Sequence, residues 1–175
     1  EIMMLEDGNY PEWMTNIKTT TKRRNSIPAR NLHPNSEYQV FLKNYREAWT
    51  VVVSRLSEVK YWQIGNEVNW DYYFHPKKNE FSLQDKVKIY LDLLTHAYQA
   101  IKSVNKELKV VTAGFAEINE ATEIYLDLFL EELTRRTKTN PFFKCFDIIA
   151  WHPYIDENPD YNNFAKPNLK LYSVI

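Results

Sequence analysis

The sequence is poor in cysteine and glycine, and these shortages exclude several classes of protein. The one cysteine, Cys145, among 175 residues cannot form an intrachain disulfide and supplies no metal cage. The three glycines, Gly8, Gly65 and Gly114, form neither the G-x-G-x-x-G turn of dinucleotide-binding folds nor a phosphate loop. The four histidines are scattered, without an H-E-x-x-H helix motif or paired cysteines. We therefore expect no cofactor and no catalytic metal.

The sequence also lacks an excess charge and a long apolar run. Its 22 basic and 23 acidic residues leave a net charge of -1, so no global field attracts nucleic acid or an anionic membrane surface. The basic segment 18–30 lacks the aromatic residues that a nucleic-acid-binding surface would interleave. No apolar run approaches the roughly 20 residues of a membrane span. We expect a neutral substrate, with neither nucleic acid nor a membrane as partner.

The length and composition suit one domain. With 44% hydrophobic and 15% aromatic residues, the chain can bury one sizeable core but is too short for two ordinary domains and a linker. The sequence starts with Glu1 rather than Met, and its first residues already have the pattern of a strand. We expect residues 1–175 to form a single partial catalytic domain, cut from a longer chain.

Four short apolar runs alternate with helical patterns along the sequence. Alternation of this kind is typical of repeated βα units and a parallel sheet. The pattern predicts strands at 2–5, 59–65, 110–114 and 146–151, and helices at 37–58, 82–104 and 119–138.

Two architectures share this alternation, the open doubly wound sheet and the (β/α)₈ TIM barrel, and both keep the active site at the carboxyl ends of the strands. Because the glycine-rich turn of the open nucleotide-binding sheet is missing, we expect an α/β fold of the TIM-barrel type. A whole barrel takes about 250 residues, so four strands predict an incomplete one. An incomplete barrel exposes strand edges, which predicts a homodimer that pairs through them.

A polar and aromatic cluster follows the second predicted strand and includes Asn66, Glu67 and Trp70. Sugars present flat apolar faces and a rim of hydroxyls, so aromatic rings beside amides and a carboxylate suit a carbohydrate. Strand alternation would send Asn66 and Glu67 to opposite faces, unless the strand ends or bulges at Gly65. The simpler alternative is a strand-end turn in which Glu67 is solvated.

A second cluster, Trp151, His152 and Tyr154, follows the fourth predicted strand. A lone histidine after a strand is more often structural, and a tyrosine there can simply cap the core. Two such clusters at equivalent strand ends, however, favour one shared site.

Both motifs resemble those of a known family. Residues 61–67 (Y-W-Q-I-G-N-E) and 146–154 (F-D-I-I-A-W-H-P-Y) are similar to the fourth-strand and sixth-strand motifs of the clan A glycoside hydrolases. These are retaining (β/α)₈ enzymes that act on plant and microbial polysaccharides and oligosaccharides. The resemblance covers most of the chain and implies that it contains about strands three to six with their helices.

The resemblance also implies roles for individual residues. Glu67 would be the general acid/base, and Asn66 would bind the sugar 2-hydroxyl. The remaining candidates are His152 and Tyr154, which would orient the nucleophile and the substrate, and Trp70 and Trp151, which would stack on sugar rings.

No residue of the sequence matches the nucleophile of that clan, a glutamate at the end of the seventh strand. Retaining hydrolysis needs two carboxylates, so we expect this chain to be inactive by itself. Two alternatives stay open: a non-catalytic carbohydrate-binding or scaffold remnant of a barrel, and a lyase that uses Glu67 as a general base. A polysaccharide substrate favours an extracytoplasmic or secreted protein, and a cytoplasmic location stays open.

Overall fold

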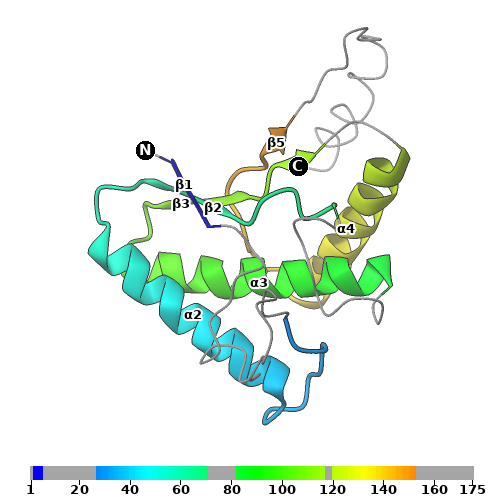
Figure 1. Cartoon of the computed structure of the whole chain (residues 1–175), viewed down its shortest axis with the longest axis horizontal. Helices are drawn as coiled ribbons and strands as arrows, with labels where there is room; N and C mark the ends of the chain where they lie inside the picture. Colours follow the sequence, from blue (N-terminus) through cyan, green and yellow to red (C-terminus); the bar gives the residue numbers. More distant parts are fainter. Residues whose placement is uncertain (1, 6–26, 71–81, 117–119, 153–175) are drawn as a thin grey trace, which may run out of the picture.

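The structure, a computed structural model, describes residues 2–5, 27–70, 82–116 and 120–152. In chain order the described elements are as follows: β1 (Ile2–Leu5), α2 (Glu37–Arg55), β2 (Tyr61–Ile64), α3 (Leu83–Val104), β3 (Lys109–Thr112), β4 (Phe115–Ala116), α4 (Glu120–Thr139) and β5 (Trp151–His152). The predicted alternation of strands and helices is therefore confirmed (Figure 1).

The helices begin where the sequence supplies a cap. The Ser36 side chain accepts a hydrogen bond from the Gln39 amide at the start of α2. At the start of α3, Ser82 and Asp85 form a capping box, in which each side chain accepts from the other residue's backbone amide. Helix α4 has acidic residues in its first turn and basic residues in its last, which complements the helix dipole. The three predicted helices are thus confirmed within a few residues.

The described strands form two short parallel sheets. The first has the order β1-β2-β3, with Ile64 opposite both Leu5 and Thr112 at its carboxyl end. The second contains only β4 and β5, which are two residues long each. A single parallel bridge, Val111 to Ile148, precedes the second sheet.

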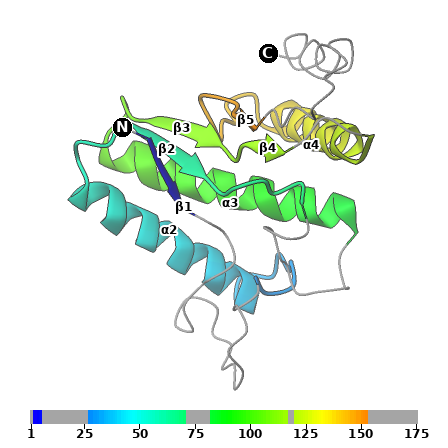
Figure 2. The ribbon, with the colours of Figure 1, turned by 45° about the horizontal axis from the view of Figure 1, so that its top comes forward.

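Helices α2 and α3 lie side by side on one face of the three-stranded sheet, and α4 lies near β4 and β5 (Figure 2). Trp49 of α2 meets Trp62 of β2 edge to face, with ring centroids 5.9 Å apart. Phe115 of β4 packs in the same way on Phe129 of α4, at 5.5 Å. These rings are almost fully buried, so aromatic packing contributes much of the hydrophobic core between helices and strands.

A buried network of charges joins the helix layer. Asp92 of α3 accepts hydrogen bonds from Arg30 and from the Tyr38 hydroxyl, at 2.8 and 2.9 Å. It also pairs with Arg136 of α4 at 2.8 Å, and Arg136 in turn pairs with Glu132 at 2.9 Å. Burial, together with the neighbouring Asp92 carboxylate, raises the pKa of Tyr38 far above its ordinary value. This network lies in the helix layer, whereas the strand ends carry the predicted site.

The prediction of a TIM barrel, incomplete or otherwise, is wrong. The described residues form two separate parallel sheets of three and two strands, with strands no longer than four residues, and no barrel segment. The predicted strand at 146–151 is reduced to a bridge at Ile148 and the two residues of β5. Alternating strand and helix patterns report only that strands are parallel, and they carry no information on whether the sheet curves and closes. The α/β character of the chain is what the pattern could predict.

Candidate functional site

The candidate site begins at a sharp turn after β2. The strand ends at Ile64, and Gly65 follows with φ of 80°. Glu67 also has a positive φ, 45°, and it alone does so among the non-glycine residues that the structure describes. The Trp70 amide then donates to the Glu67 carbonyl at 2.8 Å, which closes the turn. A left-handed backbone costs a residue with a Cβ about 1–2 kcal/mol, so the surroundings of Glu67 must hold it in place.

The turn places the Glu67 carboxylate against His152. Oε1 of Glu67 lies 2.9 Å from Nδ1 of His152, a residue 85 positions later in the chain. Glu67 is only 2% exposed, whereas the side chain of His152 is 30% exposed. The two residues come from the carboxyl ends of β2 and β5, as the sequence motifs predicted. A buried carboxylate is therefore in hydrogen-bonding contact with a partly exposed imidazole.

Gly114, between β3 and β4, contacts both Glu67 and His152. Its carbonyl accepts a hydrogen bond from the Glu67 amide at 3.1 Å. A Cβ at position 114 would lie 2.1 Å from Nε2 and 2.2 Å from Cδ2 of His152. The imidazole therefore occupies the space that any other side chain at 114 would need, which is a known use of glycine within strands.

Asn69, near the end of the turn after β2, attaches this turn to β4 through two side-chain hydrogen bonds. Its amide nitrogen donates to the Ala116 carbonyl at 2.8 Å, and its amide oxygen accepts from the Ala116 amide at 2.9 Å. The same nitrogen lies 3.0 Å from the hydroxyl of Thr122 in α4. The Asn69 side chain thus bonds to the Ala116 backbone as a neighbouring strand would. It also links the turn after β2 to the start of α4.

The remaining predicted site residues have different surroundings. Asn66 is buried, at 9% exposure, and makes no side-chain hydrogen bond within the described residues. Trp70 is partly buried and closes the turn through its backbone. Trp151 packs on Phe115 with ring centroids 6.2 Å apart, on the side of the aromatic core. Tyr154 lies outside the described residues.

Sequence reasoning missed two contributors to this site, the bonding role of Asn69 and the role of Gly114. The signal for Gly114 was present, because an isolated glycine at the end of a strand pattern often marks a close approach of another group. No local pattern distinguishes an asparagine that binds a ligand from one that binds the backbone of another strand.

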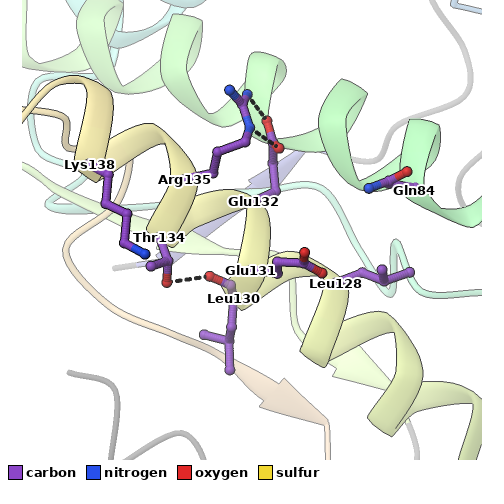
Figure 3. Close-up of a pocket in the computed structure, with 8 residues that line it drawn as sticks. All are labelled: Gln84, Leu128, Leu130, Glu131, Glu132, Thr134, Arg135 and Lys138. Carbon is purple, nitrogen blue, oxygen red and sulfur yellow. Dashed lines mark hydrogen bonds and ion pairs between the residues drawn. The ribbon is translucent and has the colours of Figure 1, made fainter.

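A separate pocket of about 430 Å³ is lined by residues of α4 and of the first turn of α3 (Figure 3). Its lining mixes aliphatic with charged side chains, and the Glu132 carboxylate in its wall is held by two hydrogen bonds from Arg135, each 2.7 Å long. None of the predicted site residues lines it. Glu67 and His152 are therefore not part of this pocket.

Within its described part, the chain has neither a candidate metal site nor a candidate membrane span. No group of three or more histidine, cysteine or acidic residues could hold a metal ion there. None of the helices in those ranges is long and apolar enough to cross a membrane. No protein-family profile matches the sequence, and no curated protein matches it either.

Proposed function

We propose that Glu67 is the general acid/base of a glycoside hydrolase, and that the observation supporting this best is the buried, strained Glu67 held against His152. Strained backbone that surrounding structure over-determines is concentrated at functional sites. A solvated strand-end glutamate, the simpler alternative from the sequence, would be exposed, whereas Glu67 is 2% exposed. This proposal rests on the geometry of Glu67 and on the resemblance of its motif to that of the clan A enzymes.

The Glu67–His152 pair suits proton transfer in both directions. A general acid must give a proton to the departing glycosidic oxygen and then take one from water. The 2.9 Å contact between Oε1 and Nδ1 holds the carboxyl group in one orientation, so His152 fixes the direction in which Glu67 meets the substrate. His152 is thereby a positioning residue, which orients the carboxyl group and balances its charge.

Asn66 supports carbohydrate as the substrate. Asn66 precedes Glu67 in the chain, and its side chain makes no hydrogen bond within the described residues, so it can pair with a sugar hydroxyl. We propose that it binds the 2-hydroxyl of the sugar beside the scissile bond, in an oligosaccharide or polysaccharide. Such substrates favour a protein that acts outside the cytoplasm.

We also propose that Glu67 does not complete the reaction without a second carboxylate. The retaining mechanism places two carboxyl groups about 5–5.5 Å apart, and no position of the sequence matches the nucleophile motif of the clan A enzymes. The 175-residue chain should then bind oligosaccharides without cleaving them.

The test combines binding and turnover. Isothermal titration of the chain with xylo-, cello- and manno-oligosaccharides should detect binding that Asn66→Ala weakens by roughly tenfold, or 1.4 kcal/mol. Glu58→Gln, which changes an exposed glutamate just before β2, is the matched control and should bind as the parent does. In the natural protein that contains this sequence, Glu67→Ala should lose hydrolysis of substrates with poor leaving groups, and azide should restore turnover of activated ones.

Each outcome separates the candidate functions. Binding with no turnover in that natural protein would support the non-catalytic carbohydrate-binding alternative, which the missing nucleophile motif favours. Turnover by the 175-residue chain, abolished by Glu67→Gln, would refute the need for a second carboxylate from elsewhere. If no neutral oligosaccharide binds and none is cleaved, the carbohydrate proposal fails as a whole.

A further inference from the structure

The backbone ladder between β2 and β3 stops just before Glu67, and a side chain takes over there. Tyr90, a fully buried residue of α3, places its hydroxyl between the two strands. The hydroxyl accepts a hydrogen bond from the Ala113 amide at 2.6 Å and donates one to the Ile64 carbonyl at 3.1 Å. Ile64 is the last paired residue of β2, and Ala113 directly follows Thr112, the last paired residue of β3.

This hydroxyl bridge keeps the strands apart where the turn needs room. In an uninterrupted parallel pair, backbone groups at these positions would bond to each other and the ladder would continue. With the hydroxyl inserted, the next direct link between the two segments is the bond from the Glu67 amide to the Gly114 carbonyl, at 3.1 Å. The positive φ values of Gly65 and Glu67 fall within this widened stretch.

The position of the hydroxyl is itself fixed by packing. The Tyr90 ring meets Phe115 of β4 edge to face, with centroids 6.4 Å apart, and lies 6.1 Å from Phe129 of α4. Both phenylalanines are fully buried, so the ring cannot leave its place without disturbing the core.

We propose that Tyr90 is a positioning residue for the Glu67–His152 pair. It acts through the backbone, since its hydroxyl sets the separation of Ile64 and Ala113 and thereby the place of Gly114. The Gly114 carbonyl then accepts the hydrogen bond from the Glu67 amide. Because Gly114 has no Cβ, the imidazole of His152 has space beside it. The effect on geometry stands on these contacts alone, whereas an effect on hydrolysis also rests on the proposed function.

The experiment compares two Tyr→Phe variants. Tyr90→Phe removes the hydroxyl and keeps the ring contacts. Tyr38→Phe is the matched control, because Tyr38 is also fully buried and loses one hydrogen bond, to Asp92 in the helix layer. The readout is the imidazole ¹⁵N spectrum of His152, assigned with His152→Gln, which reports the hydrogen bond at Nδ1. Thermal unfolding of both variants is measured alongside.

Both variants should melt a few degrees below the parent, but only Tyr90→Phe should move the His152 signals toward those of an imidazole without a carboxylate partner. In the natural protein that contains this sequence, the same variant should lower kcat/KM by at least about tenfold with little change in KM, because small misplacements of a catalytic group reduce the rate strongly. Moved His152 signals with unchanged turnover would leave the positioning role standing and count against the hydrolase proposal instead.

Unchanged His152 signals in Tyr90→Phe, or an equal change in Tyr38→Phe, would overturn the positioning role. If Tyr90→Phe does not fold, 3-fluorotyrosine at position 90 replaces it, because fluorine alters the donor and acceptor strength of the hydroxyl while nearly keeping its volume. His152 signals that shift on fluorination support the proposal, and signals that stay unchanged refute it.

Discussion

Gly114→Ala should act on His152 rather than on its own backbone. The φ of Gly114 lies outside the left-handed region, which only Gly65 among the described glycines adopts, so alanine can take the same conformation. Its Cβ, however, would lie 2.1 Å from Nε2 of His152, where ordinary contact needs at least about 3.4 Å. The imidazole must therefore move by more than about 1 Å, which breaks its 2.9 Å bond to Glu67.

The magnitude follows from two opposing contributions. A hydrogen bond to a charged group contributes about 1.5–3 kcal/mol, and its loss leaves the buried Glu67 with a weaker set of partners. Replacing glycine by alanine at a compatible position stabilises by about 0.4–1 kcal/mol, because the unfolded chain becomes less flexible. The net effect should be a loss of about 1–2 kcal/mol of unfolding free energy.

A double-mutant cycle with His152→Ala isolates the cause. Without the imidazole nothing obstructs the new Cβ, so Gly114→Ala in that background should be neutral or slightly stabilising. The assay is urea denaturation of the four proteins, with a coupling energy of about 1.5–3 kcal/mol expected between the two positions. If Gly114→Ala costs the same with and without His152, the clash is not the reason for glycine at 114, and the reasoning about this site is refuted.

Three further predictions concern other contacts. Hydrogen bonding to Arg135 is the main cause that lowers the pKa of Glu132 to about 2. The associated stability, up to about 2 kcal/mol, is complete above pH 4.5 and is lost as the pH falls toward 2. Glu132→Gln should therefore weaken the dependence of the melting temperature on pH across that range, and an unchanged dependence would contradict this. Asn69→Ala should cost about 1–2 kcal/mol in urea denaturation, because it leaves the Ala116 amide without its partner, whereas the Ala116 carbonyl keeps its bond from the Thr122 hydroxyl at 3.0 Å. A cost below about 0.5 kcal/mol would show that water or another group replaces the amide. Burial raises the pKa of Cys145 to about 12, so iodoacetamide should modify it only after unfolding, and rapid labelling of the native protein would show that the core around it opens.

The helices could be predicted because their signals are local. Ser82 and Asp85 are three residues apart and cap each other, and the buried positions of α2 recur at helical spacing, from Tyr38 to Val53. Burial of one helical face and a side-chain cap each involve residues within a few positions of one another. In these helices, the residues that determine the structure are close to one another both in the sequence and in space.

The site could be predicted only in part, for the opposite reason. The motifs indicated that Glu67 and His152 lie at the carboxyl ends of two strands, and the structure has them at the ends of β2 and β5, which belong to different sheets. The direction in which Trp151 packs depends on Phe115, and the interruption of the ladder depends on Tyr90. These contacts join residues 23 or more positions apart, and no periodicity encodes them. The same limit explains the wrong architecture, since closure of a sheet is a property of distant strands.

The backbone of Glu67 argues that the carboxylate itself is needed at this position. Glycine or asparagine would adopt a φ of 45° at less cost, and an apolar residue would be easier to bury. The chain instead combines three unfavourable choices, a residue with a Cβ, a left-handed conformation and 2% exposure for a carboxylate. Asn69, Gly114 and His152 each make a contact that stabilises this arrangement. Stability alone would favour a different residue at 67, so the arrangement supports the proposal that Glu67 acts as a general acid/base.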